Sequence, residues 1–550
     1  MLVAEAVGHH LAALGVRTAF GVVGSGNFHV TNALVAAGVR FVAAAHEGGA
    51  ASMADAYARV AGRVPVLSVH QGPGVTNALT GITEAAKSRT PLLVLAPEAT
   101  AAGSNFFIDL AACAAAVGAD YVRVRAARVY EDVTGAYRTA VSGAGRTVVL
   151  GLPLDVQAQP APAKAGPETG GWPQPDGGAE PPDDRVAALA DLLRRARRPV
   201  FIAGRGAARH HGRVRPALAA LADRCGALLA VSAAAKGLFA GDPWYLDISG
   251  GFASPLAADL IARSDLVVAW GSTLNMWTTR HGKLIPDGTT VVQVDLDPAA
   301  LGTNRPVDLG VAGDVTLVAE AVAVRLGEVR ATGWRTPEVA GRIAAEGRWR
   351  EVPYVDESGA GRIDPRTFSI ALDDLLPAAR TVAVDSGNFM GYPSMYLSVP
   401  DSAGFCFTQA YQSIGLGLAS AIGAAVARPD RLTVAALGDG GFLMSVAELS
   451  TAVRLGLPLL VVVYNDAAYG AEVHHFGPDK HPLDLVTFPD TDLARIGEGF
   501  GCAGLTVRSP ADLAGVADWL AGSRDRPLLV DAKVTASRGA WWLEEAFRGH

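Results

Sequence analysis

Two short polar segments near residue 450 carry the ligand types that a magnesium ion and a phosphate group need. Residues 438–441 read Gly-Asp-Gly-Gly, and Asn465-Asp466 follow further along the chain. Carboxylate and amide oxygens are hard ligands suited to Mg²⁺, and glycine amides at a helix N-terminus favour phosphate oxygens. The two segments predict a magnesium-diphosphate site, with an ordinary glycine turn and polar strand ends as the alternative.

The elements around these segments predict that they meet in space. The apolar stretches 431–437 and 458–464 are typical of buried strands, and 442–456 has helical spacing with Gly456 suited to the C-terminal cap. A strand, a helix and a strand in this order form a βαβ unit with a parallel sheet. Both strands then end at the same sheet edge, where ligands of open α/β sheets bind.

The first part of the chain carries three similar polar turns. Gly24-Ser25-Gly26, His46-Glu47 and His70-Gln71 each follow a predicted strand, and Gly72-Pro73-Gly74 comes directly after the third turn. Each turn alone fits a structural role; a glutamate at a helix start, for example, is usually a capping charge. Three such turns at one sheet edge instead favour a ligand site.

Composition and charge exclude several classes of protein. Hydrophobic residues make up 50% and charged residues 18% of the 550-residue chain, which fits a large buried core rather than disorder. The formal net charge of -7, with no block of basic residues, argues against a nucleic-acid partner. Four widely spaced cysteines predict neither a zinc site nor a disulfide framework. The sequence shows no signal-type segment and no apolar run of transmembrane length, so we expect a cytoplasmic protein with no membrane partner.

Alternating apolar strands and helix patterns predict three α/β domains with parallel sheets, at residues 1–156, 184–330 and 363–535. Residues 157–183 are rich in Pro and Gly and predict a linker. Residues 331–362 predict a looser polar connection, and the tail 536–550 has two tryptophans that dock on the body or cover a site. Residues 204–209 imitate part of a dinucleotide fingerprint but lack its final glycine, which argues against a nicotinamide cofactor.

The order and spacing of several motifs resemble the thiamine-diphosphate enzymes of the acetolactate synthase, benzoylformate decarboxylase and pyruvate decarboxylase superfamily. The motifs are HEGGAASMADAYAR, GPGVTN, VVQVDLDP and GLGLASAIGA, together with the Gly-Asp-Gly to Asn-Asp unit. The resemblance implies three doubly wound α/β domains: pyrimidine-binding, central and diphosphate-binding. It also implies thiamine diphosphate and Mg²⁺ as cofactors. Sites of this family form between subunits, which implies at least a homodimer and favours a homotetramer.

The resemblance assigns roles to individual cofactor residues. Glu47 would bond to the pyrimidine N1′, where a shared proton favours the imino form of the 4′ amine. Ile414 would prop the cofactor into its bent shape, with a core isoleucine as the alternative, and the Gln412 carbonyl would receive the 4′ amine. The cofactor residues it implies are Glu47, Asn388, Gln412, Ile414, Gly438, Asp439, Gly440, Gly441, Asp466, Ala468 and Tyr469.

The implied metal ligands are Asp439, Asp466 and the Ala468 carbonyl. Asp466 departs from the family, whose members have a second asparagine there. Aspartate is still a hard oxygen ligand, and its additional negative charge lies beside the diphosphate.

The substrate-facing residues follow from matches to individual branches of the superfamily. Ser25 and His70 match active-site positions of benzoylformate decarboxylase-like members, and Glu472 matches a catalytic carboxylate of pyruvate decarboxylase-like members. A histidine and a glutamate can protonate the carbanion that decarboxylation leaves. Phe106-Phe107 replaces the usual Phe-Gln pair of acetolactate synthases, and their flavin-binding segment is absent from the sequence, so FAD is doubtful.

These residues predict an enzyme that decarboxylates a 2-oxo acid and then protonates the activated aldehyde or ligates it to a second carbonyl. One alternative is a flavin- or phosphate-dependent oxidase or acyltransferase, and another is a non-catalytic relative that binds the cofactor. An aromatic or branched substrate side chain is suggested by Phe28, Phe106, Phe107, Phe389 and Tyr392, with core packing as the alternative for each.

Overall fold

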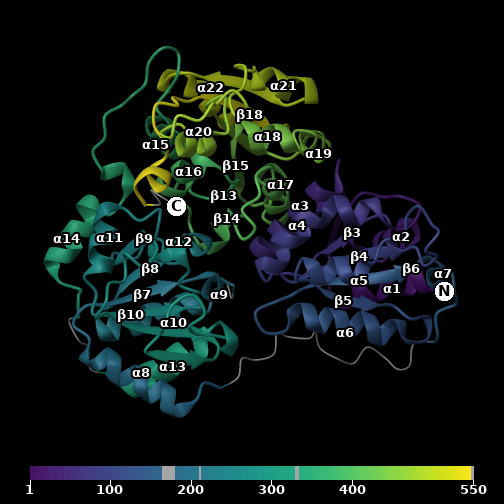
Figure 1. Ribbon diagram of the computed structural model, residues 1–550, viewed down its shortest axis with the longest axis horizontal. Helices are drawn as coiled ribbons and strands as arrows, with labels where there is room; N and C mark the ends of the chain where they lie inside the picture. Colours follow the sequence, from purple (N-terminus) through teal and green to yellow (C-terminus); the bar gives the residue numbers. More distant parts are fainter. Residues whose placement is uncertain (164–179, 210–211, 329–332, 547–550) are drawn as a thin grey trace.

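The computed structural model describes residues 1–163, 180–209, 212–328 and 333–546. It contains three six-stranded sheets in which all paired strands run parallel, and these form three lobes (Figure 1). The predicted α/β fold class with three parallel-sheet domains is therefore confirmed. Most of the predicted linker 157–183 lies outside the described residues, and its boundaries stay a prediction.

The N-terminal sheet has the strand order β2-β1-β3-β4-β6-β5. Its central strand β4 is almost continuously apolar and buried, as a parallel strand covered on both faces should be. The elements of this part are α1 (Val3–Ala13), β1 (Thr18–Gly21), α2 (Phe28–Ala36), β2 (Arg40–Ala43), α3 (Glu47–Ala61), β3 (Val66–Ser68), α4 (Pro73–Lys87), β4 (Leu92–Glu98), α5 (Leu110–Ala116), β5 (Asp120–Arg123), α6 (Val129–Val141), β6 (Thr147–Pro153) and α7 (Leu154–Gln157).

The central sheet has the order β12-β11-β10-β7-β8-β9. Gly204 and Gly206 of the fingerprint-like segment pack against the loop after β10, where a Cβ on Gly204 would lie 2.3 Å from the Gly271 carbonyl oxygen. Loop packing therefore requires these glycines. The elements are α8 (Asp183–Arg195), β7 (Pro199–Ala203), α9 (Arg205–Ala208), α10 (Val214–Cys225), β8 (Leu228–Val231), β9 (Tyr245–Ile248), α11 (Pro255–Ala262), β10 (Leu266–Trp270), α12 (Met276–Thr279), β11 (Thr290–Asp295), β12 (Leu309–Ala312), α13 (Val315–Leu326) and α14 (Pro337–Glu346).

The C-terminal sheet has the order β14-β13-β15-β16-β18-β17, which repeats the connectivity of the N-terminal sheet. Its elements are α15 (Pro365–Leu375), β13 (Arg380–Val384), α16 (Gly391–Tyr396), β14 (Phe405–Phe407), α17 (Gly417–Ala427), β15 (Leu432–Gly438), α18 (Asp439–Ser445), α19 (Glu448–Arg454), β16 (Leu459–Asn465), α20 (Gly470–Phe476), α21 (Leu493–Phe500), β17 (Ala503–Val507), α22 (Ala514–Ala521) and β18 (Leu528–Lys533). A short π-helical turn, Trp542–Ala546, follows in the tail.

Helices α3 and α17 join the N-terminal and C-terminal domains. Both are rich in Ala and Gly, and their backbones approach so closely that a Cβ on Gly423 would lie 2.1 Å from the Met53 carbonyl oxygen. Small side chains therefore place the two cofactor-type domains directly against each other.

Two predicted segments differ in detail. The single helix predicted at 442–456 is two helices, α18 and α19, and the Ser445 hydroxyl at the break donates back to the Gly441 carbonyl. The predicted polar connection 331–362 contains α14 and a buried Trp349.

Within the described residues, no helix combines the length and apolarity needed to cross a bilayer.

Candidate active site

Asp439 and Asp466 lie together at the C-terminal edge of the third sheet. Asp439 is the first residue of α18, directly after β15, and Asp466 directly follows β16. These strands are neighbours, with Gly438 paired to Tyr464. The Ala468 amide donates to Asp439 Oδ2 over 3.1 Å. The fold therefore brings the three predicted metal ligands to one point, as parallel strand ends require.

The two neighbouring carboxylates, Asp439 and Asp466, favour a bound cation. Burial raises the pKa of Asp439 to about 6, although hydrogen bonds from the amides of Gly440 and Ala468 act in the opposite direction and lower it. Burial and the neighbouring Asp439 raise the pKa of Asp466 to about 8. Two carboxylates that repel each other in a buried setting are stabilised by a divalent ion.

The donor set also fits Mg²⁺, because it consists of two carboxylates and one carbonyl, all hard oxygens. No cluster of three or more His, Cys, Asp or Glu side chains of metal-binding type occurs among the described residues. A third Asp, Glu, His or Cys side chain is therefore not found beside this pair in the described part of the chain, and the Ala468 carbonyl stays the predicted third ligand.

The glycine turn at the start of α18 is required by close packing. A Cβ on Gly440 would lie 2.4 Å from the Tyr469 ring, and one on Gly441 would lie 2.6 Å from Asp385 Oδ2. Gly438, the N-cap, is similarly close to the Phe389 ring. Since the first amides of a helix lack intrahelical acceptors, this packing leaves them at the sheet edge beside the carboxylate pair, which suits a diphosphate.

Asn388 is fixed by the C-terminal tail. Its side-chain oxygen accepts a hydrogen bond from the Ala540 amide over 2.7 Å, and its carbonyl accepts one from the Trp542 indole over 2.9 Å. The side-chain nitrogen faces Gly470 instead, where it is available to donate to a ligand. The tail tryptophan thus docks on the body of the domain beside a predicted cofactor residue.

Gln412 and Ile414 lie in the turn before α17 and line a cavity of about 570 Å³. Gln412 is exposed and has a φ of +60°, a strained conformation for a residue other than glycine. Ile414 is only half-buried, which argues against the core alternative. Asp385 fixes the turn by accepting the amides of Gly415 and Leu416 over 2.9 and 3.2 Å.

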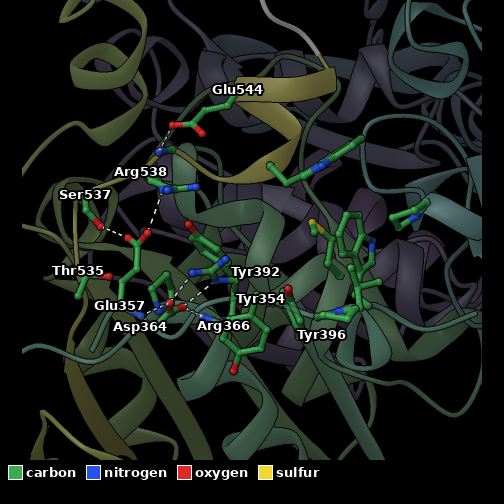
Figure 2. A pocket seen from close by; sticks show the side chains of 18 residues that line it. Tyr354, Glu357, Asp364, Arg366, Tyr392, Tyr396, Thr535, Ser537, Arg538 and Glu544 are labelled. Atoms are coloured by element: carbon green, nitrogen blue, oxygen red, sulfur yellow. Dashed lines mark hydrogen bonds and ion pairs between the residues drawn. The ribbon is translucent and has the colours of Figure 1, made fainter. Parts of the chain in front are cut away.

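The same cavity is bordered by all three domains and by the tail. Glu472, on α20, and Trp542 line it from the C-terminal domain, and Arg205 lines it from the central domain. Behind the tail lies a second cavity of about 300 Å³ (Figure 2). Its charged side chains are paired, since Arg538 and Ser537 point to Glu357 and Arg366 points to Asp364. Tail residues line both cavities, Trp541 the smaller one and Trp542 the larger one.

The three polar turns of the N-terminal domain meet at its sheet edge. The Gly26 amide lies 3.2 Å from His70 Nδ1, which places the Ser25 turn against the histidine. A Cβ on Gly74 would contact both His70 and Glu47, at 3.1 and 3.4 Å. Glu47, His70 and the Ser25 turn are thus neighbours.

Sequence reasoning missed Asn77, whose side-chain amide donates to Glu47 Oε2 over 3.1 Å. It is the last residue of the GPGVTN motif. Asn77 lies one turn into α4, beside a glycine turn, and this position was the sequence feature that could have indicated a site residue.

One chain brings the predicted residues together in two groups, not one. The cavity that contains Gln412, Ile414 and Glu472 is not lined by Glu47, His70 or Ser25. Glu47 and the Asp439 pair belong to different sheets.

Phe389 and Tyr392 are buried and stack on Tyr464, with ring centroids 5.6 and 6.2 Å apart. This packing favours the core alternative for Phe389, whereas Tyr392 lines the smaller cavity (Figure 2). Phe28, Phe106 and Phe107 are exposed, and Phe106 contacts His70 edge-on at 5.4 Å.

Comparison with known proteins identifies the family. Three family models match: the thiamine pyrophosphate enzyme N-terminal binding domain over residues 1–112, its central domain over 186–322 and its C-terminal binding domain over 385–532. A "Probable 2-ketoarginine decarboxylase AruI" from Pseudomonas aeruginosa is 32% identical over 92% of this chain and 88% of its own length. A sulfoacetaldehyde acetyltransferase from Alcaligenes xylosoxydans xylosoxydans is 29% identical over 86% of this chain and 82% of its own. A catabolic acetolactate synthase from Raoultella terrigena is 29% identical over 92% and 90%.

The matched models span the two domains that carry the two groups of polar residues and the domain between them. The chain therefore belongs to the thiamine pyrophosphate enzymes and is a thiamine-diphosphate-dependent member of their decarboxylase and carboligase family.

Proposed function

We propose that this protein decarboxylates a 2-oxo acid and protonates the activated aldehyde or ligates it to a second carbonyl, with thiamine diphosphate and Mg²⁺. The observation that carries this proposal is the buried carboxylate pair Asp439 and Asp466 beside the N-terminus of α18. The decarboxylase and the synthase among its relatives support the reaction type.

Each cofactor residue has one task in this proposal. Asp439, Asp466 and the Ala468 carbonyl would hold Mg²⁺, and the α18 amides and Asn388 would donate to the diphosphate. Tyr469 packs against Gly440 and keeps that helix start in place. Bound thiamine diphosphate supplies the electron sink for the electron pair released as carbon dioxide leaves. Glu47 would share a proton with the pyrimidine ring, and the Gln412 carbonyl and the Ile414 side chain would orient that ring.

His70, Ser25 and Glu472 act on the substrate. Because the Gly26 amide donates a hydrogen bond to His70 Nδ1 over 3.2 Å, the proton of the ring is on Nε2. Nε2–H would then donate a hydrogen bond to the substrate, and a proton passed from it to the carbon that lost the carboxylate would have to be replaced from solvent so that no imidazolate is left. Glu472 is exposed and lines the cavity with Gln412, so it is a second proton donor from the other group.

A second copy of the chain completes the site in this proposal. Glu47 belongs to the N-terminal domain and the Asp439 pair to the C-terminal domain, and Glu47 does not line the cavity that contains Gln412. We infer that a neighbouring copy supplies one of the two groups. Large apolar side chains are exposed around both groups: Phe106 (42%), Phe107 (43%), Leu443 (40%) and Met444 (57%). Exposed apolar side chains around both groups favour an interface there, and we propose a cytoplasmic homodimer that can pair into a homotetramer.

The first experiment is carbon dioxide release from a panel of 2-oxo acids, with thiamine diphosphate and Mg²⁺ present and products identified by proton NMR. Release with a free aldehyde is the result expected if His70 and Glu472 donate protons. Release with a hydroxyketone assigns ligation and identifies the acceptor. Failure of every acid in the panel would contradict the proposal.

Acyl transfer to an anionic acceptor is a second candidate, favoured by Arg205. This side chain lines the cavity, has no hydrogen-bond or ion-pair partner among the described residues, and has its pKa lowered to about 9 by burial and by Arg59. An unpartnered guanidinium suits a phosphate or sulfonate group. Formation of acetyl phosphate and sulfite from sulfoacetaldehyde and inorganic phosphate, lost in Arg205→Gln, would favour this candidate. Sulfite leaves with the electron pair of the broken carbon–sulfur bond, so this acyl transfer needs no oxidant.

Asp466→Asn is expected to raise the Mg²⁺ Kd by about tenfold, because metal affinity follows the charge of the ligands. The same change is expected to raise the Tm of metal-free protein, since it removes repulsion between two buried carboxylates. Calorimetric titration and thermal unfolding measure the two effects. Asp401→Asn, in a carboxylate paired with Arg431, is the control. An unchanged Mg²⁺ Kd in Asp466→Asn would contradict the expected contribution of the Asp466 charge to metal affinity.

A further inference from the structure

The turn that leads into Glu47 is held by side chains from the C-terminal domain. After β2 ends at Ala43, Arg454 of α19 donates to the Ala43 carbonyl over 2.7 Å. Glu448, also on α19, accepts the amides of Ala45 and His46 over 3.2 and 3.0 Å. Figure 1 shows α19 beside α3, which begins at Glu47.

The turn that leads into Gln412 is held in the same manner by the N-terminal domain. After β14 ends at Phe407, Arg59 of α3 donates to the Phe407 carbonyl over 2.9 Å. Glu84 of α4 accepts the amides of Ala410 and Tyr411 over 3.1 and 2.7 Å. Each pair, Glu448 with Arg454 and Glu84 with Arg59, is called a carboxylate anchor below.

The fold explains why the two anchors are reciprocal. Strands β2 and β14 occupy the same edge position in two sheets of identical strand order, and α3 packs against α17 between them. Each turn therefore faces a helix of the other domain. In each case an arginine donates to the carbonyl at the strand end. A carboxylate accepts hydrogen bonds from the two amides directly before the residue proposed to contact the cofactor.

The anchors are built to be rigid. The exposed fractions of Glu84 and Glu448 are 1% and 2%, and hydrogen bonds to a buried carboxylate are stronger than those between neutral groups. Burial alone would raise the pKa of Glu84, but Arg59 and the two amides outweigh burial and hold it below its usual value. Thr451 adds a third hydrogen bond to Glu448 over 2.7 Å.

Gly49 makes room for the Glu448 anchor. A Cβ at this position would lie 2.1 Å from Glu448 Oε1. The second glycine of the HEGG sequence is thus required by a carboxylate from another domain, which its position beside Glu47 alone does not explain.

We propose that Glu448 and Glu84 are positioning residues: Glu448 fixes the Glu47 side of the site, and Glu84 fixes the Gln412 side. This inference rests on the proposed function of Glu47 and Gln412. It predicts effects on catalysis that a purely stabilising contact between domains would not have.

Amide hydrogen exchange tests the anchors without reference to activity. Glu448→Gln is expected to speed exchange at Ala45 and His46 by at least tenfold and to leave Ala410 and Tyr411 unchanged, and Glu84→Gln is expected to do the reverse. Gly49→Ala, which displaces the carboxylate but keeps its charge, should reproduce Glu448→Gln. Unchanged exchange in these variants would overturn the inference.

Asp265→Asn is the matched control, because Asp265 accepts two consecutive amides, Arg197 and Arg198, over 2.8 Å each, in the central domain. It should change local exchange there and leave turnover and cofactor Kd unchanged.

A double-mutant comparison tests positioning in the holoenzyme. Glu448→Gln is expected to lower kcat by tenfold or more with the thiamine diphosphate Kd within twofold of wild type. In a Glu47→Gln background the same change should not lower kcat any further, because the effects of residues that act through one another are not additive. If Glu448→Gln lowers kcat by the same factor in the wild-type and the Glu47→Gln backgrounds, the positioning role of Glu448 is overturned. Near-normal turnover of Glu47→Gln alone would instead contradict the proposed function.

Glu84→Gln is expected to raise the thiamine diphosphate Kd by at least fivefold, since the Gln412 carbonyl belongs to the turn that it fixes. Glu84→Asp, which keeps the charge, should recover part of that affinity. If the Kd of Glu84→Gln matches that of wild type while its exchange at Ala410 rises, the anchor exists but does not position Gln412, and that half of the inference fails.

Discussion

Glu47→Gln is expected to lower kcat by at least about 100-fold, the size of effect that loss of a general acid-base group produces. Glutamine has nearly the same shape and its oxygen can still accept the hydrogen bond from Asn77. The geometry at the helix start should therefore survive while proton exchange is lost. Carbon dioxide release at saturating cofactor measures the effect, and the thiamine diphosphate Kd should change little.

Glu98→Gln is the control for that experiment. Glu98 ends β4 in the same sheet, and its carboxylate is paired with Arg123 over 2.9 Å, so turnover should stay at the wild-type level. Glu47→Gln protein that turns over at a similar rate would remove Glu47 from the mechanism.

The architecture could be predicted because most strands are continuous apolar runs. The runs at β4, β10 and β16 are buried along nearly their whole length. Strand β5, at Asp120–Arg123, was not predictable from apolar patterning, because this edge strand is half-exposed and two of its four residues are charged. Edge strands need little apolar surface, so periodicity reveals them poorly.

The candidate site was predictable where it depends on strand ends. Asp439 and Asp466 follow neighbouring parallel strands, and that topology alone places them together. The burial of Phe389 on Tyr464 was not predictable, because an aromatic residue beside a polar turn has the same sequence pattern whether it faces ligand or core.

Contacts between domains could also not be predicted from the sequence. Glu448 lies within a predicted helix, where a glutamate is normally a solvated charge. Its role depends on the approach of α19 to the turn before Glu47, which only the packing of α3 on α17 determines. The same holds for Asn388, whose partner Ala540 lies in the tail.

Asp439→Ala is expected to weaken Mg²⁺-dependent binding of thiamine diphosphate by at least about 100-fold, since changes in outer-sphere residues already cost 10–100-fold in metal affinity. The loss should exceed that of Asp466→Asn because Asp439 also accepts the Ala468 amide, which fixes the turn that presents the third ligand. Asp439→Asn keeps this acceptor and separates loss of charge from loss of the turn. Asp492→Asn changes another aspartate at a helix start, one that accepts the Arg495 amide, and should leave Mg²⁺ binding unaltered. If calorimetry finds wild-type Mg²⁺ affinity in Asp439→Ala, the metal must bind elsewhere, and the buried pair of carboxylates would need another explanation.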